Sequence, residues 1–343
     1  MKCSILKKSS KKLWITTLNR FPQEARGIFF YPEYLELYEK KGESANCFIC
    51  EEGEKIFLYP FLICNIPNTK NLKDIKTAYG YGGPVSNSSD SKFIKKAYEN
   101  LRYKLLKENV ITELIKFNPF IYNKNIINNY DGKIFNEKII VYIDLKNNNE
   151  EEILNNYKKS CKKKLKKINT YGKLNIKIEN SEDALFKFKK IYDESMLKLK
   201  AEKSYFKNKN FYKKIYKNLK NNFFIFSLYE EKKILTSQLL LFDKDTINCH
   251  MYGSTEYAKE KSLIVFSYHK LIIWAKNIGF NKINFGGGRN SDPKDTLLNF
   301  KQNFSKTYFK YFIGEKILNK KTYDNLCAKQ NNKNNNKLFR YRN

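Results

Sequence analysis

The residues of this chain best suited to chemistry lie in the stretch 282–301. A short apolar run ends there at three consecutive glycines, Gly286, Gly287 and Gly288. Adjacent glycines at the end of a strand cost backbone entropy, so they indicate a place where the chain adopts positive φ or where another group approaches closely. A bound small molecule is one such group, and an ordinary corner between a strand and a helix is the alternative.

Arg289 follows the glycines directly and is one of only six arginines in the chain. Because nearly all other basic residues are lysines, this arginine is more readily explained by its planar, bidentate binding geometry. A polar turn, Asn290-Ser291-Asp292-Pro293, comes next, and a helix-like segment closes on Phe300 and Lys301. We therefore expect a strand, a turn and a helix in this order.

The most basic segment of the chain, residues 150–171, is a second candidate. Its apolar residues recur every three or four positions, at Leu154, Tyr157, Cys161, Leu165 and Ile168. This period predicts a helix with one apolar stripe and an opposite face covered by lysines, which include Lys162, Lys163 and Lys166. These lysines are either a clamp for phosphate groups of a substrate or of RNA, or a solvated helix surface.

Several common catalytic and metal-binding patterns are absent from the sequence. His250 and His269 are the only histidines, too few for most histidine-based metal sites, and we expect no bound metal. The seven cysteines follow no regular framework, which is typical of reduced thiols in a cytoplasm. No apolar run reaches the length of a signal-peptide core or a membrane span, so we expect a cytoplasmic protein.

The composition is that of a folded, strongly basic protein. Its 343 residues are enough for two domains, and 41% hydrophobic residues are enough to pack their cores. A formal net charge of +31 attracts polyanions such as RNA, an anionic membrane face or a phosphorylated glycan carrier. A lysine and asparagine bias in the coding sequence is the alternative explanation of that charge.

The two halves of the chain repeat one order of predicted elements. In the first half, strand-like runs over 45–51 and 55–64 form a hairpin, a strand over 75–81 ends in Tyr79-Gly80-Tyr81-Gly82-Gly83-Pro84, and a helix over 91–109 precedes strands over 110–117 and 133–145. In the second half, the corresponding runs are 223–229, 234–242, 246–252, 263–276 and 282–285. The third of these runs leads into Tyr252-Gly253-Ser254.

This duplication predicts an α/β (α+β) fold with two tandem domains. Each domain is expected to hold a mixed, mostly antiparallel twisted sheet flanked by helices. We place the N-terminal domain at residues 1–148 and the C-terminal domain, with the presumed active site, at residues 149–328. The Lys/Asn-rich residues 329–343 are predicted to be a disordered tail.

The tandem order resembles the FemAB-like branch of the GNAT acyltransferase superfamily. The likeness rests on the motif 79–84, the lysine-rich helix over 157–168, Met251-Tyr252-Gly253-Ser254, and the three glycines followed by Phe300-Lys301. That branch includes aminoacyl-tRNA-dependent enzymes that build peptidoglycan cross-bridges, and acetyltransferase-like relatives associated with surface-polysaccharide synthesis. The usual GNAT pyrophosphate loop, Q/R-x-x-G-x-G/A, is missing, because residues 254–261 occupy its place.

The resemblance implies direct attack of an amine on an activated carbonyl, with no permanently bound cofactor. The co-substrate would be acyl-CoA or aminoacyl-tRNA. Lys301 would stabilise developing negative charge or the leaving oxygen, and backbone N–H groups at the end of the strand 246–252 would bind the oxyanion. Tyr252 would act in the same catalytic centre, and His250 would accept the proton of the amine.

The resemblance also implies two sets of binding residues. The acceptor would contact Tyr79, Tyr81 and Phe300, and Lys162, Lys163 and Lys166 would bind its phosphates. The donor would bind at Gly286, Gly287, Gly288 and Arg289. Because the first half lacks a counterpart of the three glycines and of the Phe-Lys pair, we expect the chemistry in the second half and acceptor binding in the first.

The predicted function is therefore that of an N-acyltransferase acting on a cell-envelope or surface-glycan precursor. The acceptor would be a nucleotide- or lipid-linked amino sugar or peptide, and tRNA and an anionic membrane surface are further expected partners. The alternative is a non-catalytic GNAT-like protein that binds nucleic acid or an anionic surface, since aromatic residues alternate with lysines in 205–214.

Overall fold

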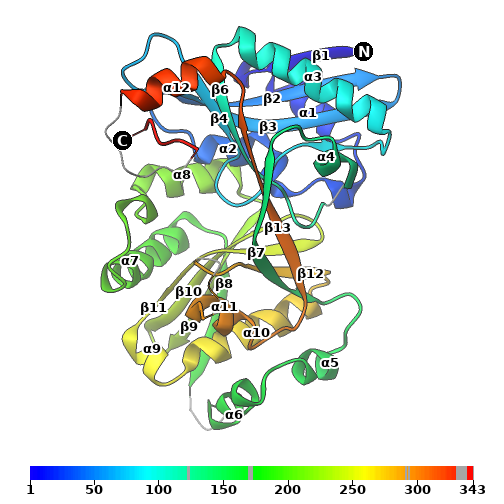
Figure 1. Ribbon diagram of the computed structural model, residues 1–343. Coiled ribbons are helices and arrows are strands. Elements are labelled where there is room, and N and C mark those ends of the chain that lie inside the picture. Colours follow the sequence, from blue (N-terminus) through cyan, green and yellow to red (C-terminus); the bar gives the residue numbers. More distant parts are fainter. Residues whose placement is uncertain (122–123, 169–172, 290–291, 293, 330–337, 343) are drawn as a thin grey trace. The chain divides into compact units, whose positions relative to one another are not determined.

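The computed structural model describes residues 1–121, 124–168, 173–289, 292, 294–329 and 338–342 (Figure 1). The chain folds into two compact units: unit 1 comprises Met1–Glu137 and Lys310–Asn343, and unit 2 comprises Lys138–Phe309. It passes from unit 1 to unit 2 within β7 (Lys133–Asp144) and returns within β13 (Tyr308–Ile317). The boundary therefore lies before the predicted 148/149, and the last part of the chain belongs to the first unit.

Unit 1 is built on a mixed sheet in the order β1-β2-β3-β4-β6-β13. The bounds are β1 (Lys2–Leu6), β2 (Glu43–Glu52), β3 (Lys55–Asn65), β4 (Lys73–Lys76) and β6 (Val110–Lys116), and the short β5 (Val85–Ser86) pairs with β3. Neighbouring strands are antiparallel except β4 and β6, which are parallel. Its helices are α1 (Lys11–Leu18), α2 (Pro32–Leu37), α3 (Ser91–Lys107), α4 (Lys124–Asn128) and α12 (Lys320–Ala328).

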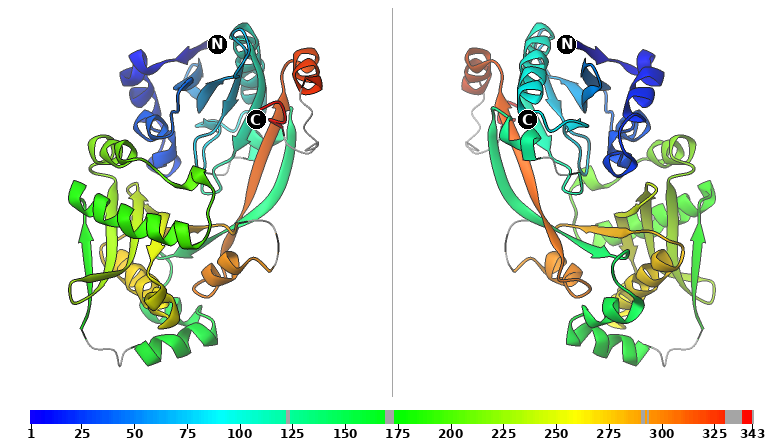
Figure 2. Two further views of the ribbon diagram at one scale, coloured as in Figure 1. Left: turned by 90° about the vertical axis from the view of Figure 1, so that its left-hand side faces the viewer. Right: turned by 90° about the vertical axis from the view of Figure 1, so that its right-hand side faces the viewer.

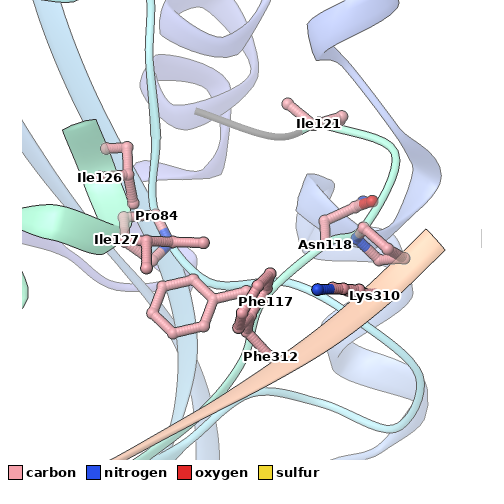
Figure 3. Close-up of a pocket in the computed structure, with 9 residues that line it drawn as sticks. Pro84, Phe117, Asn118, Ile121, Ile126, Ile127, Lys310 and Phe312 are labelled. Atoms are coloured by element: carbon pink, nitrogen blue, oxygen red, sulfur yellow. The ribbon is translucent and has the colours of Figure 1, made fainter. Parts of the chain in front are cut away.

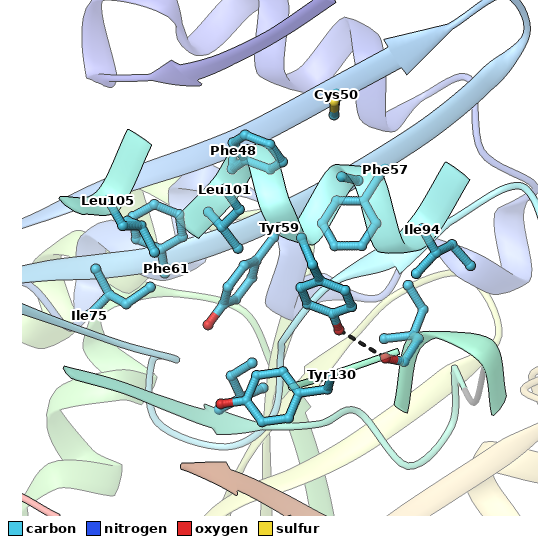
Figure 4. Packing of buried hydrophobic residues seen from close by; sticks show 14 of the residues in the cluster. Phe48, Cys50, Phe57, Tyr59, Phe61, Ile75, Ile94, Leu101, Leu105 and Tyr130 are labelled. Atoms are coloured by element: carbon cyan, nitrogen blue, oxygen red, sulfur yellow. Dashed lines mark hydrogen bonds between the residues drawn. The ribbon is translucent and has the colours of Figure 1, made fainter. Parts of the chain in front are cut away.

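Helix α3 shows why these residues form these elements. Asp90 caps its N-terminus by accepting hydrogen bonds from the backbone N–H groups of Lys92 and Phe93. The apolar stripe of α3, formed by Phe93, Ala97, Leu101 and Leu105, is buried against the sheet, where it joins a cluster rich in aromatic rings. Figure 4 shows part of this cluster, including Leu101 and Leu105 of α3 and Tyr59 of β3.

In unit 2 the neighbouring strands follow the order β7-β12-β11-β10-β9-β8 and again form a mixed sheet. Its strands are β8 (Leu174–Glu179), β9 (Phe223–Glu230), β10 (Lys233–Phe242), β11 (Thr246–Ser254) and β12 (Lys282–Gly286). Here β11 and β12 are the parallel pair. The helices are α5 (Glu150–Asn155), α6 (Lys159–Ile168), α7 (Glu182–Lys198), α8 (Lys209–Asn218), α9 (Glu256–Glu260), α10 (Leu263–Asn277) and α11 (Thr296–Lys301). Helices α7 and α10 cover opposite faces of this sheet (Figure 2).

The predicted internal duplication is confirmed by the topology. In unit 1, β2, β3 and β4 are consecutive antiparallel strands, and α3 connects β4 to the parallel β6. In unit 2, β9, β10 and β11 are consecutive antiparallel strands, and α10 connects β11 to the parallel β12. The third strand of unit 1 ends at Lys76, earlier than predicted, so Tyr79 and Tyr81 lie in a loop.

The last described segment, residues 338–342, contradicts the predicted disordered tail. Leu338 and Tyr341 are buried in a small apolar cluster with Tyr323 of α12. The Tyr341 hydroxyl donates to Asp74 Oδ1 at 2.5 Å, and the Arg342 guanidinium pairs with Asp74 Oδ2 at 2.6 Å. Burial of these apolar side chains and pairing with the buried Asp74 carboxylate hold this segment in place, although the neighbouring sequence has low complexity. Residues 330–337 and 343 lie outside the described residues.

The cysteines also differ from the expectation of free thiols throughout. Cys3 of β1 and Cys50 of β2 are directly opposed in the antiparallel register, and their sulfur atoms are joined in a disulfide. This pairing depends on β1, an element that the sequence did not predict. Cys47, Cys64, Cys161, Cys249 and Cys327 are free.

Candidate active site

The parallel strands β11 and β12 of unit 2 separate before either strand ends. Register pairs join Thr246–Asn248 to Lys282–Asn284, whereas β11 continues to Ser254 and β12 to Gly286. Among the described residues, the later part of β11 therefore has no strand partner on this side. Backbone groups freed in this way are ready to bind a ligand, and ligands commonly bind beyond the carboxyl ends of parallel strands.

A β-bulge lies at the point of separation. Leu239 of β10 pairs with Met251, and Leu240 pairs with Cys249, so His250 is the additional residue on β11. Bulges bend a strand and redirect its side chains, and they are frequent beside active sites. Burial, with a smaller contribution from the nearby charge of Lys207, lowers the pKa of His250 to about 3. Its imidazole is therefore neutral at physiological pH.

Lys301 is a buried lysine at the end of α11, with 9% of its surface exposed. Its Nζ donates a hydrogen bond of 2.6 Å to the carbonyl oxygen of Gly287. Burial lowers the pKa of Lys301 to about 8, although interactions with Cys249 and Asp295 partly oppose that effect. Lys301 is thus still mostly charged near neutral pH and titrates slightly above it. A lysine in this state can donate a proton or stabilise negative charge.

Asp295 holds α11 and the glycine turn together. Its carboxylate accepts hydrogen bonds from the backbone N–H groups of Leu298, at 2.7 Å, and Arg289, at 2.8 Å. The first contact is an N-cap of α11. These two hydrogen bonds hold α11, and with it Lys301, close to the end of β12.

Besides the predicted role in donor binding, the structure of the turn itself explains why glycine is favoured at two of these positions. Gly286 has a φ of +75°, which favours glycine. A Cβ at Gly288 would lie 2.9 Å from the Asp295 carboxylate. The close approach predicted from the sequence is therefore made here by the protein itself. Residues 290, 291 and 293 of the predicted turn lie outside the described residues, and Arg289 is exposed.

An aromatic cluster adjoins Lys301 between β11, α10 and α11. Tyr252 and Phe300 both contact Tyr268, with ring centroids 5.5 and 5.3 Å apart, and Phe304 stacks on Tyr268. Burial holds the pKa of Tyr268 far above its usual value, so its hydroxyl stays protonated. Sequence reasoning missed Tyr268 and Cys249. Tyr268 lies among the buried residues of α10, and the sequence of that helix does not indicate which residues its buried face meets.

The lysine-rich segment forms two helices and not the single predicted one: Leu154 lies on α5, Tyr157 lies between the helices, and α6 begins at Lys159. Cys161, Leu165 and Ile168 of α6 are buried. Lys163 and Lys166 are exposed, and the partly exposed Lys162 donates from Nζ to Asn155 Oδ1 at 3.3 Å. Their arrangement is compatible both with a phosphate clamp and with a solvated face.

The two remaining predicted residues belong to unit 1. Tyr79 is 51% exposed and stacks on Tyr38, with ring centroids 5.6 Å apart. Tyr81 packs edge to face against Phe29 and Tyr311. The other predicted site residues, including Lys301, belong to unit 2.

Unit 1 also has a small pocket of its own (Figure 3). Apolar side chains form most of its wall, among them Phe117, Ile126 and Phe312, and Lys310 and Asn118 supply polar groups. Pro84, the last residue of the motif 79–84, lines it as well. None of the predicted site residues lines this pocket.

The described residues contain neither a candidate metal cluster nor a candidate membrane-spanning helix. Within them, no group of three or more His, Cys, Asp or Glu side chains is arranged to hold a metal ion. Likewise, no helix in the described part of the chain is long and apolar enough to cross a membrane.

The separated strands, the bulge and the buried lysine lie in the part of the chain that matches a known family. Residues 155–302 match the model of the Acetyltransferase (GNAT) domain. This part of the chain is similar to GNAT domains. It contains β11, β12 and Lys301, so the candidate site lies within it. No curated protein sequence matches the chain.

Solved structures extend the likeness to the fold of nearly the whole chain. FemX aligns with a TM-score of 0.71 at 11% identity, over 94% of this chain and 99% of FemX. The C-terminal domain of a lysylphosphatidylglycerol synthetase from Agrobacterium fabrum aligns with a TM-score of 0.55 at 11% identity, over 92% of each chain. A tandem GNAT protein from the clavulanic acid biosynthesis pathway aligns with a TM-score of 0.53 at 6% identity, over 92% of this chain and 98% of that chain. The predicted resemblance to the FemAB-like branch of the GNAT superfamily is confirmed at the level of the fold.

Proposed function

We propose that the protein is an N-acyltransferase that moves an acyl or aminoacyl group to an amine of a cell-envelope or surface-glycan precursor. The GNAT domain supports acyl transfer in general terms. The observation that carries the proposal is the buried Lys301, whose Nζ reaches the carbonyl oxygen of Gly287 just after β12, beside the unpaired part of β11. The neighbours named FemX and lysylphosphatidylglycerol synthetase support an envelope-related acceptor.

The proposed reaction forms one bond and breaks one. The amine nitrogen of the acceptor attacks the carbonyl carbon of the donor and forms a C–N bond. The C–S bond of a thioester, or the C–O bond of an aminoacyl ester, then breaks, and the leaving sulfur or oxygen takes up a proton as the amine loses one. Negative charge develops first on the carbonyl oxygen and then on the leaving atom.

Lys301 is suited to that developing charge. Buried cations and backbone N–H groups stabilise an oxyanion far better than solvent-exposed ones, because the surrounding dielectric is low. With its pKa lowered to about 8, Lys301 can also donate the proton that the leaving group needs. Free N–H groups of β11 after Asn248 would bind the carbonyl oxygen.

His250 and Tyr252 are assigned supporting roles on β11. The neutral imidazole of His250 is able to accept a proton, although its pKa of about 3 makes it a weak base. Tyr252 would orient the acyl group, since its ring packs against Tyr268 and its hydroxyl stays protonated. The acceptor would approach with its phosphates toward Lys162, Lys163 and Lys166 of α6.

The donor is either acyl-CoA or aminoacyl-tRNA. Helix α9 and its flanking residues occupy the position of the usual GNAT pyrophosphate loop, which argues against standard CoA binding. The net charge of +31 favours a polyanionic donor such as tRNA. The match of residues 155–302 to the acetyltransferase (GNAT) family favours an acyl-CoA donor.

A labelled-donor assay tests the proposal. Purified protein is incubated with radiolabelled acetyl-CoA or charged tRNA and with amino-sugar nucleotides, and amide formation is measured for the wild type and for Lys301→Ala. Turnover that is lost in the variant supports the proposal. Absence of turnover with every donor, together with tight and salt-sensitive RNA binding, would establish the non-catalytic alternative. Lysines over aromatic rings, such as Lys207 over Phe211, favour that second function.

A further inference from the structure

Gln238 is a buried amide that finds no partner in the described part of the chain. It lies on β10 with 1% of its surface exposed, and among the described residues neither its Oε1 nor its Nε2 makes a hydrogen bond. Buried polar groups are nearly always paired, so a glutamine with both amide atoms unpaired requires an explanation. Its neighbours on the same face of β10, Thr236 and Leu240, are fully buried.

A second unpaired polar atom lies directly across the sheet. Gln238 is opposite Tyr252 in the β10–β11 register, so the two side chains stand on the same face. The Tyr252 hydroxyl is buried and makes no hydrogen bond of normal geometry within the described residues, although Thr236 and Ser254 flank it. Thr236 itself is paired, since it donates to Ser267 at 2.8 Å.

These two residues lie next to the proposed reaction centre. The following pair on the same face is Leu240 with Cys249, and Cys249 interacts electrostatically with Lys301. Two residues along a strand span about 7 Å, so an acyl group with its carbonyl near Lys301 would extend along β11 toward Gln238 and Tyr252. Tyr252 also contacts Tyr268 of α10, which packs on the same face of the sheet.

The chemistry of the two side chains limits what they can bind. An amide offers an acceptor oxygen and two N–H donors, and a phenol offers one donor and an acceptor. A charged group would be poorly accommodated, because the residues facing Gln238 in the register, Phe226 and Tyr252, are neutral and the site is buried. The complementary ligand group is therefore neutral and both donates and accepts, as a hydroxyl or a carboxamide does.

We propose that Gln238 and Tyr252 form an acyl-recognition subsite that selects a donor whose acyl group carries a neutral hydrogen-bonding substituent over the corresponding plain alkyl donor. The proposal rests on the acyltransferase function and specifies its substrate class. A site that hydrogen-bonds a substrate hydroxyl discriminates strongly against an analogue that lacks it, since the buried polar groups then remain unpaired. Plain acetyl and butanoyl groups would bind but would leave Gln238 unsatisfied.

Binding of matched donors tests the subsite without knowledge of the acceptor. For a CoA donor, titration calorimetry compares 3-hydroxybutanoyl-CoA with butanoyl-CoA; for a tRNA donor, filter binding compares one tRNA carrying serine or alanine. We expect the hydroxylated donor to bind the wild type at least about tenfold more tightly. In Gln238→Met, which keeps the side-chain length without the amide, the two donors should bind equally, and the melting temperature should not fall.

Ser237→Ala is the matched control. Ser237 is the preceding residue on β10 and faces the other side of the sheet, where its hydroxyl is already paired with Ser227 at 2.7 Å. The variant should lower the melting temperature and leave the preference between donors unchanged. Equal binding of the two donors by the wild type would overturn the subsite alone. A lower melting temperature of Gln238→Met, with both donors weakened equally, would also overturn it, because it identifies a structural glutamine satisfied by water. Failure of every donor to bind would overturn the acyltransferase proposal as well.

Discussion

The two units build the same parallel strand pair, but only the pair in unit 2 separates. In unit 1 the pairing continues beyond β4: Gly82 donates from its backbone N–H to the carbonyl oxygen of Lys116, and its own carbonyl oxygen accepts from Asn118. An isolated parallel bridge joins Gly82 to Phe117. In unit 2 the register ends at Asn248, and the bulge at His250 follows.

We call the parallel strand pair of unit 1 closed, because its hydrogen bonding continues, and that of unit 2 open, because its strands separate. The segment after β4 satisfies the backbone groups of β6, which leaves no room for a ligand between those strands. The additional residue in β11 bends that strand at the corresponding point, so its backbone groups stay available. The same topology can therefore be a scaffold in one unit and a candidate site in the other.

Among the buried ionisable side chains, Glu113 of unit 1 and Lys301 of unit 2 have pKa values shifted toward neutral pH. In unit 1, burial raises the pKa of Glu113 on β6 to about 7. The groups around Glu113 are Lys316, its partner in the β13 register, together with Tyr59, Tyr130 and Asp131. In unit 2, burial lowers the pKa of Lys301 to about 8. Glu113 lies at the closed pair and Lys301 at the open one, so their replacement should affect different properties.

Replacement of Lys301 should have the largest effect. In Lys301→Ala, loss of the buried cation should reduce kcat by about 10²- to 10³-fold, as for removal of one oxyanion donor. The unfolding free energy should change little by comparison. Lys294→Ala is the control, because Lys294 is exposed just before α11. An equal loss of activity in both variants would show that α11, and not the ammonium group, is what matters.

The pH dependence of turnover is a second test of the role of the charged Lys301. Lys301 is charged below its pKa of about 8 and neutral above it, so turnover that needs the ammonium group should fall as the pH rises through about 8. Lys301→Arg stays charged throughout, and any activity it retains should lack this decline. A wild-type profile that is flat between pH 7 and pH 9 would contradict a role for the charged lysine.

Glu113 should control the pH dependence of stability and leave activity alone. Its folded-state pKa of about 7 lies above the usual glutamate value of 4.5, so the folded state favours the protonated carboxyl. Stability from this group is fully present below about pH 4.5 and is lost as the pH rises to about 7, by up to about 3 kcal/mol. In Glu113→Gln this loss should disappear when urea unfolding is compared at pH 5 and pH 8. An unchanged difference between the two pH values would refute the assignment.

The C-terminal segment should stabilise unit 1 without contributing to the site of unit 2. Arg342→Ala leaves the Asp74 carboxylate with its bonds to Thr112 and Tyr341 but without its cation, which should cost about 2 kcal/mol in unfolding free energy. Arg340→Ala is a nearby control that keeps the Asp74 pair. Thermal unfolding of both variants, with turnover measured in parallel, would detect an unexpected coupling between the segment and activity.

The smallest effect is expected for the lysines of α6. Exchange of Lys162, Lys163 and Lys166 for glutamine should raise KM for a phosphate-bearing acceptor several-fold and leave kcat and the melting temperature nearly unchanged. Each exposed lysine contributes little by itself, because solvent and salt screen its charge. Unchanged kinetics would identify this face of α6 as solvated surface.

Much of the architecture could be predicted from local patterns. The alternation of apolar residues located β2, β3, β9, β10 and β11, and the helical period located α3, α6 and α10. The duplicated order followed from these elements, because consecutive strands usually pair and a helix usually joins parallel strands. Lys301 and the glycine turn were also recognised, from residue types and from the family likeness.

Other features depended on contacts between distant parts of the chain. The separation of β11 from β12, the burial of Lys301 beside Cys249, and the unpaired amide of Gln238 all arise where segments remote in sequence meet. The docking of Tyr341 onto Asp74 joins residues 267 positions apart. Local periodicity assigns a residue to the apolar or polar side of its own element, but the opposing partner, and with it the pKa and the unmet hydrogen bonds, is set by packing.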